Sequence, residues 1–157
     1  MDLLKRMHER HGEEWRTISV DLHSCGLSLE GWKTIEKNYP NIFLSLSDVI
    51  NSRSENHVHL IKGCAEDRLL AESDYDNIQH SVSQTWKMVE TIANLRGWEV
   101  ETSWEEEAPP LEKWGVVRRL ERNWLRFQAG NHPEIVHKSR RLRKQHQYYP
   151  SDESEEE

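Results

Sequence analysis

Apolar residues recur at steps of three and four positions through most of the chain, and this period constrains the fold more than any other feature of the sequence. The first stripe spans residues 2–23 and consists of Leu3, Leu4, Met7, His11, Trp15, Ile18 and Leu22. The sequence has no alternating run bounded by hairpin turn signals. The pattern therefore predicts helices and gives little support to a β architecture.

Glycine, proline and serine divide the next segment into short helices. Ser28 is placed to cap a second helix, which ends before Pro40. Residues 41–50 also fit a helical stripe, although the run is short and β-branched at its end. A fourth helix is predicted from a stripe that consists of Val58, Ile61, Ala65 and Leu69.

The later helices are predicted in the same way. A brief fifth helix covers residues 73–78, and a sixth begins at Ser83 and is closed by Gly97. The stripe of the sixth helix predicts that Trp86 lies in the core. Two prolines then precede a long amphipathic helix, which Gly130 ends.

The fold class predicted from these stripes is all-α. A chain of 157 residues has room for one core and an appendage. Residues 1–98 are expected to form a compact bundle of about six short amphipathic helices. The remaining parts are expected to be an acidic proline-containing joint at 99–110, the long helix at 111–130, a basic arm at 131–149 and a disordered acidic tail at 150–157.

Charge is segregated along the chain. The net charge is −7, but residues 99–112 carry six glutamates and no basic residue. Residues 113–149 carry ten basic residues against two acidic ones, and residues 151–157 add five acids. Alternating blocks of like charge are typical of solvated arms and interaction tails.

Several classes of protein are disfavoured by composition. The longest apolar runs are a few residues long, far below the roughly 20 needed to cross a bilayer, and the N-terminus lacks the pattern of a secretory signal. Two cysteines cannot form a disulfide framework. We expect no membrane contact and a cytoplasmic and nuclear location.

No motif predicts catalysis. The glycines are isolated, so no phosphate-binding loop is present. A zinc site could be imagined from His57, His59 and Cys64 with Cys25 or His23, but the sequence contains no Cys-x-x-Cys pair. We therefore expect a non-enzymatic protein without a metal or another cofactor.

One stretch resembles a known family. Leu60-Ile61-Lys62-Gly63-Cys64-Ala65-Glu66-Asp67-Arg68-Leu69-Leu70 and the following residues to Gly97 look like the middle of a caspase-recruitment (CARD) domain of the death-fold superfamily. Ala71 departs from the threonine usual at the turn of that family, and a clear first helix is missing. The resemblance implies an adaptor that stacks with like domains through charged faces. The residues implied in these contacts are Lys62, Arg68, Asp74 and Asp76.

The basic arm is the second functional feature. Its bases are Lys138, Arg140, Arg141, Arg143 and Lys144. The preceding helix adds a secondary basic face that consists of Arg118, Arg119, Arg122 and Arg126. Such density fits a nuclear-localisation signal, a nucleic-acid contact or a solubilising arm. Ser154, with an acid three residues later, is a phosphorylation candidate.

Two functional hypotheses follow. The first is a non-enzymatic helical interaction module or adaptor. It would recruit a protein partner, either a different protein or a second domain of the same kind, and its basic arm would be recognised by an import receptor. The alternative is a small nuclear or viral accessory regulator that binds RNA or DNA through the basic C-terminal segment.

Overall fold

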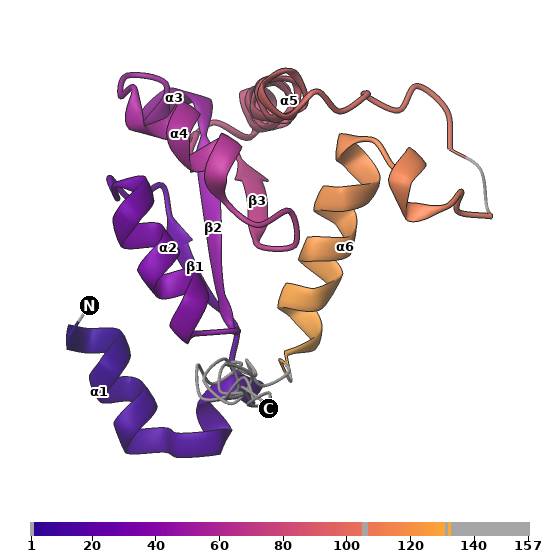
Figure 1. The fold of residues 1–157 in the computed structure, drawn as a ribbon. Helices are drawn as coiled ribbons and strands as arrows, with labels where there is room; N and C mark the ends of the chain where they lie inside the picture. The colour runs from indigo at the N-terminus through magenta and orange to yellow at the C-terminus, as the bar shows by residue number, and fades with distance from the viewer. Residues whose placement is uncertain (1, 105–106, 131, 133–157) are drawn as a thin grey trace, which may run out of the picture.

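Three short strands pair in parallel to form a sheet in the centre of the molecule (Figure 1). The computed structural model describes residues 2–104, 107–130 and 132. The strands are β1 (Val20–His23), β2 (Ile42–Ser47) and β3 (Leu69–Glu72), in the order β1-β2-β3. The architecture is therefore mixed α/β, and the prediction of an all-α helical bundle is wrong.

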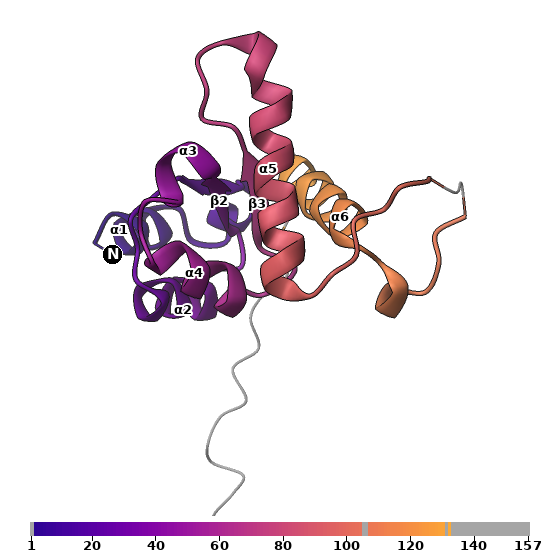
Figure 2. The ribbon, with the colours of Figure 1, turned by 90° about the horizontal axis from the view of Figure 1, so that it is seen from above.

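Helices connect the strands, as parallel pairing requires. α2 (Leu29–Asn38) joins β1 to β2, and α3 (Asp48–Asn51) with α4 (Asn56–Gly63) joins β2 to β3. The other helical segments are α1 (Asp2–His11), a 3-10 helix (Gly12–Thr17), α5 (Ile78–Arg96), a second 3-10 helix (Leu111–Lys113) and α6 (Val116–Ala129). α2 and α4 lie on one side of the sheet and α6 lies on the other (Figures 1 and 2).

The sequence predicts helices where the structure has strands, because the apolar residues of these strands also fit a helical period. Every residue of β2 is buried, so the strand lies inside the predicted helix at 41–50 without an exposed face to reveal its alternation. β1 lies inside the predicted helix at 2–23, of which α1 covers the first half. Leu69, assigned to the fourth helix, begins β3.

The sequence predicts two helix ends correctly, at Ser28 and at Gly97, although it predicts one helix that the structure does not contain. The Ser28 hydroxyl accepts a hydrogen bond from the Gly31 N–H at 3.2 Å and caps α2, as predicted. Gly97 ends α5 in the left-handed region, with φ of 67°, a conformation that glycine adopts without a steric penalty. The separate helix predicted at 73–78 is absent from the described chain, and α5 begins at Ile78 with Asn77 as its cap.

The main core lies between the sheet and the helices α2, α4 and α5. Alternate strand residues project into it. These are Val20 and Leu22 of β1, Ile42, Leu44 and Leu46 of β2, and Leu69 and Ala71 of β3. They pack with Trp32 and Ile35 of α2, Leu60 and Ile61 of α4, and Met88 and Ile92 of α5.

Trp86 is not part of this core. Its side chain is 43% exposed, whereas Met88, Val89, Ile92 and Ala93 of the same helix are buried. The prediction that Trp86 is a core residue is wrong, because the buried residues of α5 begin at Met88 and Trp86 precedes them on the exposed N-terminal part of the helix.

Within the described residues, no helix combines the length and the apolar composition that a membrane span requires.

The acidic joint contributes to the start of α6. The Glu101 carboxylate accepts hydrogen bonds from the backbone N–H groups of Val117 at 2.9 Å and Arg118 at 3.2 Å. An anion at this position satisfies free N–H groups and interacts favourably with the helix dipole. Gly115 leaves room for the Glu99 carbonyl, which accepts the Val116 N–H at 2.8 Å.

Candidate functional site

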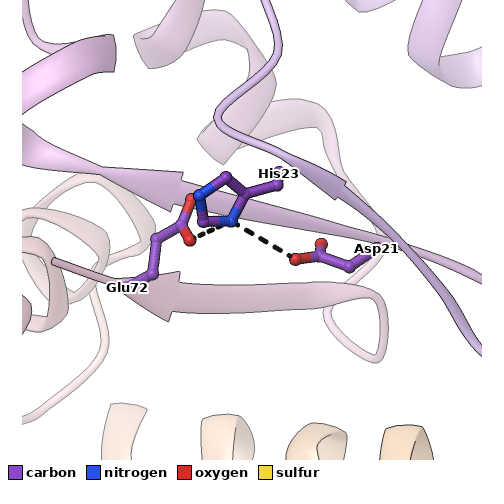
Figure 3. A group of neighbouring side chains, drawn as sticks. All are labelled: Asp21, His23 and Glu72. Atoms are coloured by element: carbon purple, nitrogen blue, oxygen red, sulfur yellow. Dashed lines mark ion pairs between the residues drawn. The ribbon is translucent and has the colours of Figure 1, made fainter. Parts of the chain in front are cut away.

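Two carboxylates and one imidazole converge at one edge of the sheet. The side-chain ligand atoms of Asp21, His23 and Glu72 all lie within 4.8 Å of one another, and we call these residues the His23 cluster. Figure 3 shows the His23 ring between the two carboxylates. His23 Nδ1 forms an ion pair with Glu72 Oε2 and lies 3.7 Å from Asp21 Oδ2. It is the one group of this kind within residues 2–104, 107–130 and 132.

The parallel sheet is what assembles the cluster. Asp21 and His23 are two residues apart on β1, so the pleat directs both side chains to the same face. Glu72 is the last residue of β3 and His23 the last of β1. Because parallel strands end at the same edge of a sheet, these residues meet at the carboxyl edge, where α/β proteins bind their ligands.

Serine hydroxyls hold the carboxylates in place. Ser45, on the central strand between them, has its Oγ 2.7 Å from Asp21 Oδ2 and 3.1 Å from Glu72 Oε1. The Ser45 N–H also donates to Asp21 Oδ1 at 3.1 Å. The Ser24 hydroxyl donates to Glu72 Oε1 at 2.7 Å. Both carboxylates are therefore oriented by residues outside the cluster.

A further layer of contacts fixes Ser24. Its Oγ lies 2.9 Å from the Ser47 hydroxyl and 3.1 Å from Asn51 Oδ1. Asn51 Oδ1 also accepts the Ser47 N–H at 2.9 Å, which connects the network to the helix after β2. Hydrogen bonds of this outer layer limit how far the Glu72 carboxylate can turn.

Backbone strain is concentrated beside the cluster. Ser24 has φ of 42° and Asp74 has φ of 51°, and these are the non-glycine residues with positive φ in the described chain. Ser24 directly follows His23, and Asp74 lies two residues after Glu72. Such conformations cost of order 1–3 kcal/mol each and are concentrated at functional sites.

His23 faces acids on both ring nitrogens. Nδ1 faces Glu72 and Asp21, and Nε2 lies 3.4 Å from Asp74 Oδ1. Partial burial alone lowers the pKa of His23, but the carboxylates of Glu72, Asp74 and Asp21 together raise it above its ordinary value. The neighbouring carboxylates therefore favour the protonated, positively charged form of the His23 imidazole.

Glu72 is the most enclosed carboxylate of the site, with a side chain 16% exposed. Burial raises the pKa of Glu72 above its ordinary value, against the opposing effects of the Ser24 hydrogen bond and the His23 charge. Three carboxylates thus surround one imidazole, and in the described chain the ion pairs of Asp21, Glu72 and Asp74 are all with His23. A bound cation would neutralise this excess of negative charge.

The four residues implied by the CARD resemblance are not brought together as one surface. Arg68 is buried and its guanidinium donates to the carbonyls of Tyr39 and Ile42. Asp74 faces His23, whereas Lys62 and Asp76 are exposed. The resemblance itself stays a prediction, but the six-helix bundle that it implied is not the fold observed.

The four arginines of α6 are engaged within the chain. Arg118 and Arg119 are buried, and the Arg118 guanidinium lies over the Trp104 ring at 4.0 Å. Acid partners on the loop before β3 pair with the others: Arg119 with Glu66 at 2.5 Å, Arg122 with Glu66 at 3.9 Å and Arg126 with Asp67 at 2.7 Å. These contacts attach α6 to the sheet and occupy the face expected to be basic.

Apart from His132, the basic arm at 131–149 lies outside the described residues, and so does the acidic tail at 150–157. This holds for the arm bases Lys138, Arg140, Arg141, Arg143 and Lys144 and for Ser154. The nuclear-localisation, nucleic-acid and phosphorylation hypotheses therefore stay predictions.

Of the zinc ligands considered in the sequence, Cys64 is buried. Burial raises the pKa of the Cys64 thiol well above the ordinary range, which disfavours the thiolate that would bind zinc.

The sequence patterns do not point to Asp21 or Glu72, and they offer His23 only as a possible zinc ligand beside His57, His59 and Cys64. One signal was available: Val20-Asp21-Leu22-His23 alternates apolar and polar residues, which places the two polar side chains on the same face of a strand. A second was the acidic run Glu72-Ser73-Asp74 directly after Leu69-Leu70-Ala71.

Comparisons with known proteins do not identify the candidate site. No protein-family model, curated protein or solved structure matches the chain at a significant level. The candidate site therefore depends on its own geometry.

Proposed function

We propose that the His23 cluster binds a divalent metal ion and that the chain takes part in metal-assisted hydrolysis. The observation that carries the proposal is the convergence of Asp21, His23 and Glu72 within 4.8 Å at the carboxyl edge of a parallel sheet. This proposal differs from the expectation of a non-enzymatic adaptor, which came from the absence of a local motif. Here Glu72 follows His23 by 49 residues and Asp21 by 51, so no local motif would reveal the complete set.

The donor set favours a first-row divalent ion. Imidazole suits Zn²⁺ and other transition metals, whereas carboxylates suit Mn²⁺ and harder ions, so a mixed site fits Zn²⁺ or Mn²⁺ best. Three protein ligands leave at least one coordination position for water or substrate. A divalent ion in such a site lowers the pKa of bound water and polarises a carbonyl or phosphoryl oxygen.

The chain's own residues would orient these ligands. With His23 Nδ1 toward the two carboxylates, Nε2–H is left to donate to Asp74, and this fixes the ring and its tautomer. The hydroxyls of Ser24 and Ser45 donate to the Glu72 and Asp21 carboxylates and so limit their rotation. Asp74, with a side chain 30% exposed, is also able to accept a proton from solvent or substrate.

The test is metal binding by the full chain after treatment with EDTA. Titration calorimetry with Zn²⁺ and Mn²⁺ should give one site per chain. Asp21→Asn, His23→Gln and Glu72→Gln should each weaken binding by more than about 100-fold, and the positioning variant Asp74→Asn by about 10- to 100-fold. His59→Gln and Asp76→Asn, which change an exposed histidine and an exposed acid outside the cluster, are the matched controls.

Hydrolysis is then measured on 4-nitrophenyl acetate and bis(4-nitrophenyl) phosphate with and without the metal. Metal-dependent release of nitrophenol that is lost in His23→Gln and kept in His59→Gln supports the proposal. Binding weaker than millimolar, or binding that is equal in the His23 and His59 variants, overturns it.

A further inference from the structure

An apolar groove opens beside the His23 cluster, between α5 and α6. Its volume is about 370 Å³, within the range of sites for small molecules. Its lining includes Asp21, Ser45 and Glu72, so it shares residues with the cluster. The rest of the lining is largely apolar and comes from β3, α5 and α6. A molecule in the groove would therefore contact the cluster and an apolar wall at once.

Two tryptophans flank the groove and are half exposed. Trp86 of α5 is 43% exposed and Trp124 of α6 is 49% exposed. Exposed apolar side chains of this size, gathered at one cavity, indicate a binding surface. Indole rings also stack favourably with other flat rings.

Both indoles are held in place before any ligand binds. Trp86 Nε1 donates to Glu90 Oε1 at 3.1 Å, one helical turn away. The Trp124 ring stacks on Phe127, with centroids 5.7 Å apart and planes 17° apart. Fixed rings lose little conformational entropy when a ligand binds, which favours binding.

We propose that this groove binds a flat aromatic group of a ligand whose oxygen-bearing group reaches the metal ion at the His23 cluster. The inference rests on the proposed function, because the metal fixes the polar end of the ligand. Glu121 also lines the groove, so the wall is acidic as well as apolar. The aromatic group is therefore neutral or cationic, since an anionic ring would be repelled.

The probes are three hydroxamates, which chelate a metal through the same two oxygens. Acetohydroxamate has no ring, cyclohexanecarbohydroxamate has an apolar ring that is not flat, and 2-naphthohydroxamate has a flat aromatic ring. Their affinities for the Zn²⁺-loaded full chain are measured by calorimetry. We expect 2-naphthohydroxamate to bind at least about 30-fold more tightly than acetohydroxamate, with the cyclohexane compound between them.

Two variants and a matched control locate the effect. Trp86→Ala and Trp124→Ala should each weaken 2-naphthohydroxamate about tenfold and change acetohydroxamate less than about twofold. Trp104→Ala removes a tryptophan that is 52% exposed and outside the groove, and should change neither affinity. Circular dichroism shows whether each variant is folded.

The outcomes separate the two proposals. If Zn²⁺ binds at the His23 cluster but all three hydroxamates bind equally, or if the groove variants weaken acetohydroxamate as much as 2-naphthohydroxamate, the groove proposal is overturned and the metal site stands. Equal affinities of the cyclohexane and naphthalene compounds overturn the requirement for a flat ring. Failure of both Zn²⁺ and Mn²⁺ to bind at the His23 cluster overturns both proposals.

Discussion

Replacing Glu72 by glutamine should stabilise the metal-free protein, although it removes a proposed metal ligand. The ligand oxygens of Asp21 and Glu72 lie within 4.8 Å of each other. Two unit charges at that distance repel by about 3.5 kcal/mol at an effective dielectric constant of about 20. Attraction to His23 and the hydrogen bonds from Ser24 and Ser45 offset most of this repulsion. Glutamine keeps an acceptor oxygen for Ser24, so we expect the free energy of unfolding to rise by about 1 kcal/mol.

The pH dependence of this difference has a definite sign. Burial raises the pKa of Glu72 in the folded protein above its ordinary value of 4.5. At pH values below 4.5 the wild-type carboxyl is protonated and does not lower the free energy of unfolding. As the pH rises through the folded pKa of Glu72, the carboxyl ionises and the free energy of unfolding falls. The advantage of Glu72→Gln should be small in acid and fully present at pH 8.

Metal should reverse the order of the two proteins. At a free metal concentration about 100-fold above the dissociation constant, the wild type gains about 2.7 kcal/mol, whereas the variant gains little. The assay is urea unfolding followed by circular dichroism at pH 8, in EDTA and then in Zn²⁺, with Asp76→Asn as the control. Destabilisation of Glu72→Gln by more than about 1 kcal/mol in EDTA would show that the carboxylate is a structural acceptor and would refute the reasoning.

Three further predictions test the fold. Leu44→Ala, in the fully buried central strand, should lower the free energy of unfolding by about 2–5 kcal/mol, whereas Trp86→Ala should lower it by less than about 1 kcal/mol; equal losses in urea denaturation would contradict the assigned faces. Gly97→Ala, at φ of 67°, should destabilise by about 1 kcal/mol in thermal unfolding, and an unchanged midpoint would exclude the left-handed cap. Burial, with the charges of Arg126 and Arg68, lowers the pKa of His132, so stability should fall as the pH drops below 6.5. His132→Gln should flatten that fall in urea titrations at pH 7.5 and 5.5, and an equal fall in both proteins would contradict the prediction.

Local chemistry explains what could be predicted from the sequence. Ser28 at the start of α2, Gly97 at the end of α5 and Gly130 after α6 mark helix ends because capping depends on one residue and its immediate neighbours. The sequence determined these boundaries without reference to the rest of the fold. It also indicated that the chain contains amphipathic helices with short connections.

The tertiary structure alone decided the strands and the site. β2 is buried on both faces, so its residues carry no alternation strong enough to separate a strand from a short helix. Parallel pairing with β1 and β3 selects the extended form, because backbone groups find partners only on neighbouring strands. The same pairing brings Glu72 to Asp21 and His23 across Ser45. No spacing within the sequence encodes that meeting, because Asp21 and Glu72 become neighbours only through the shared edge of a three-stranded sheet.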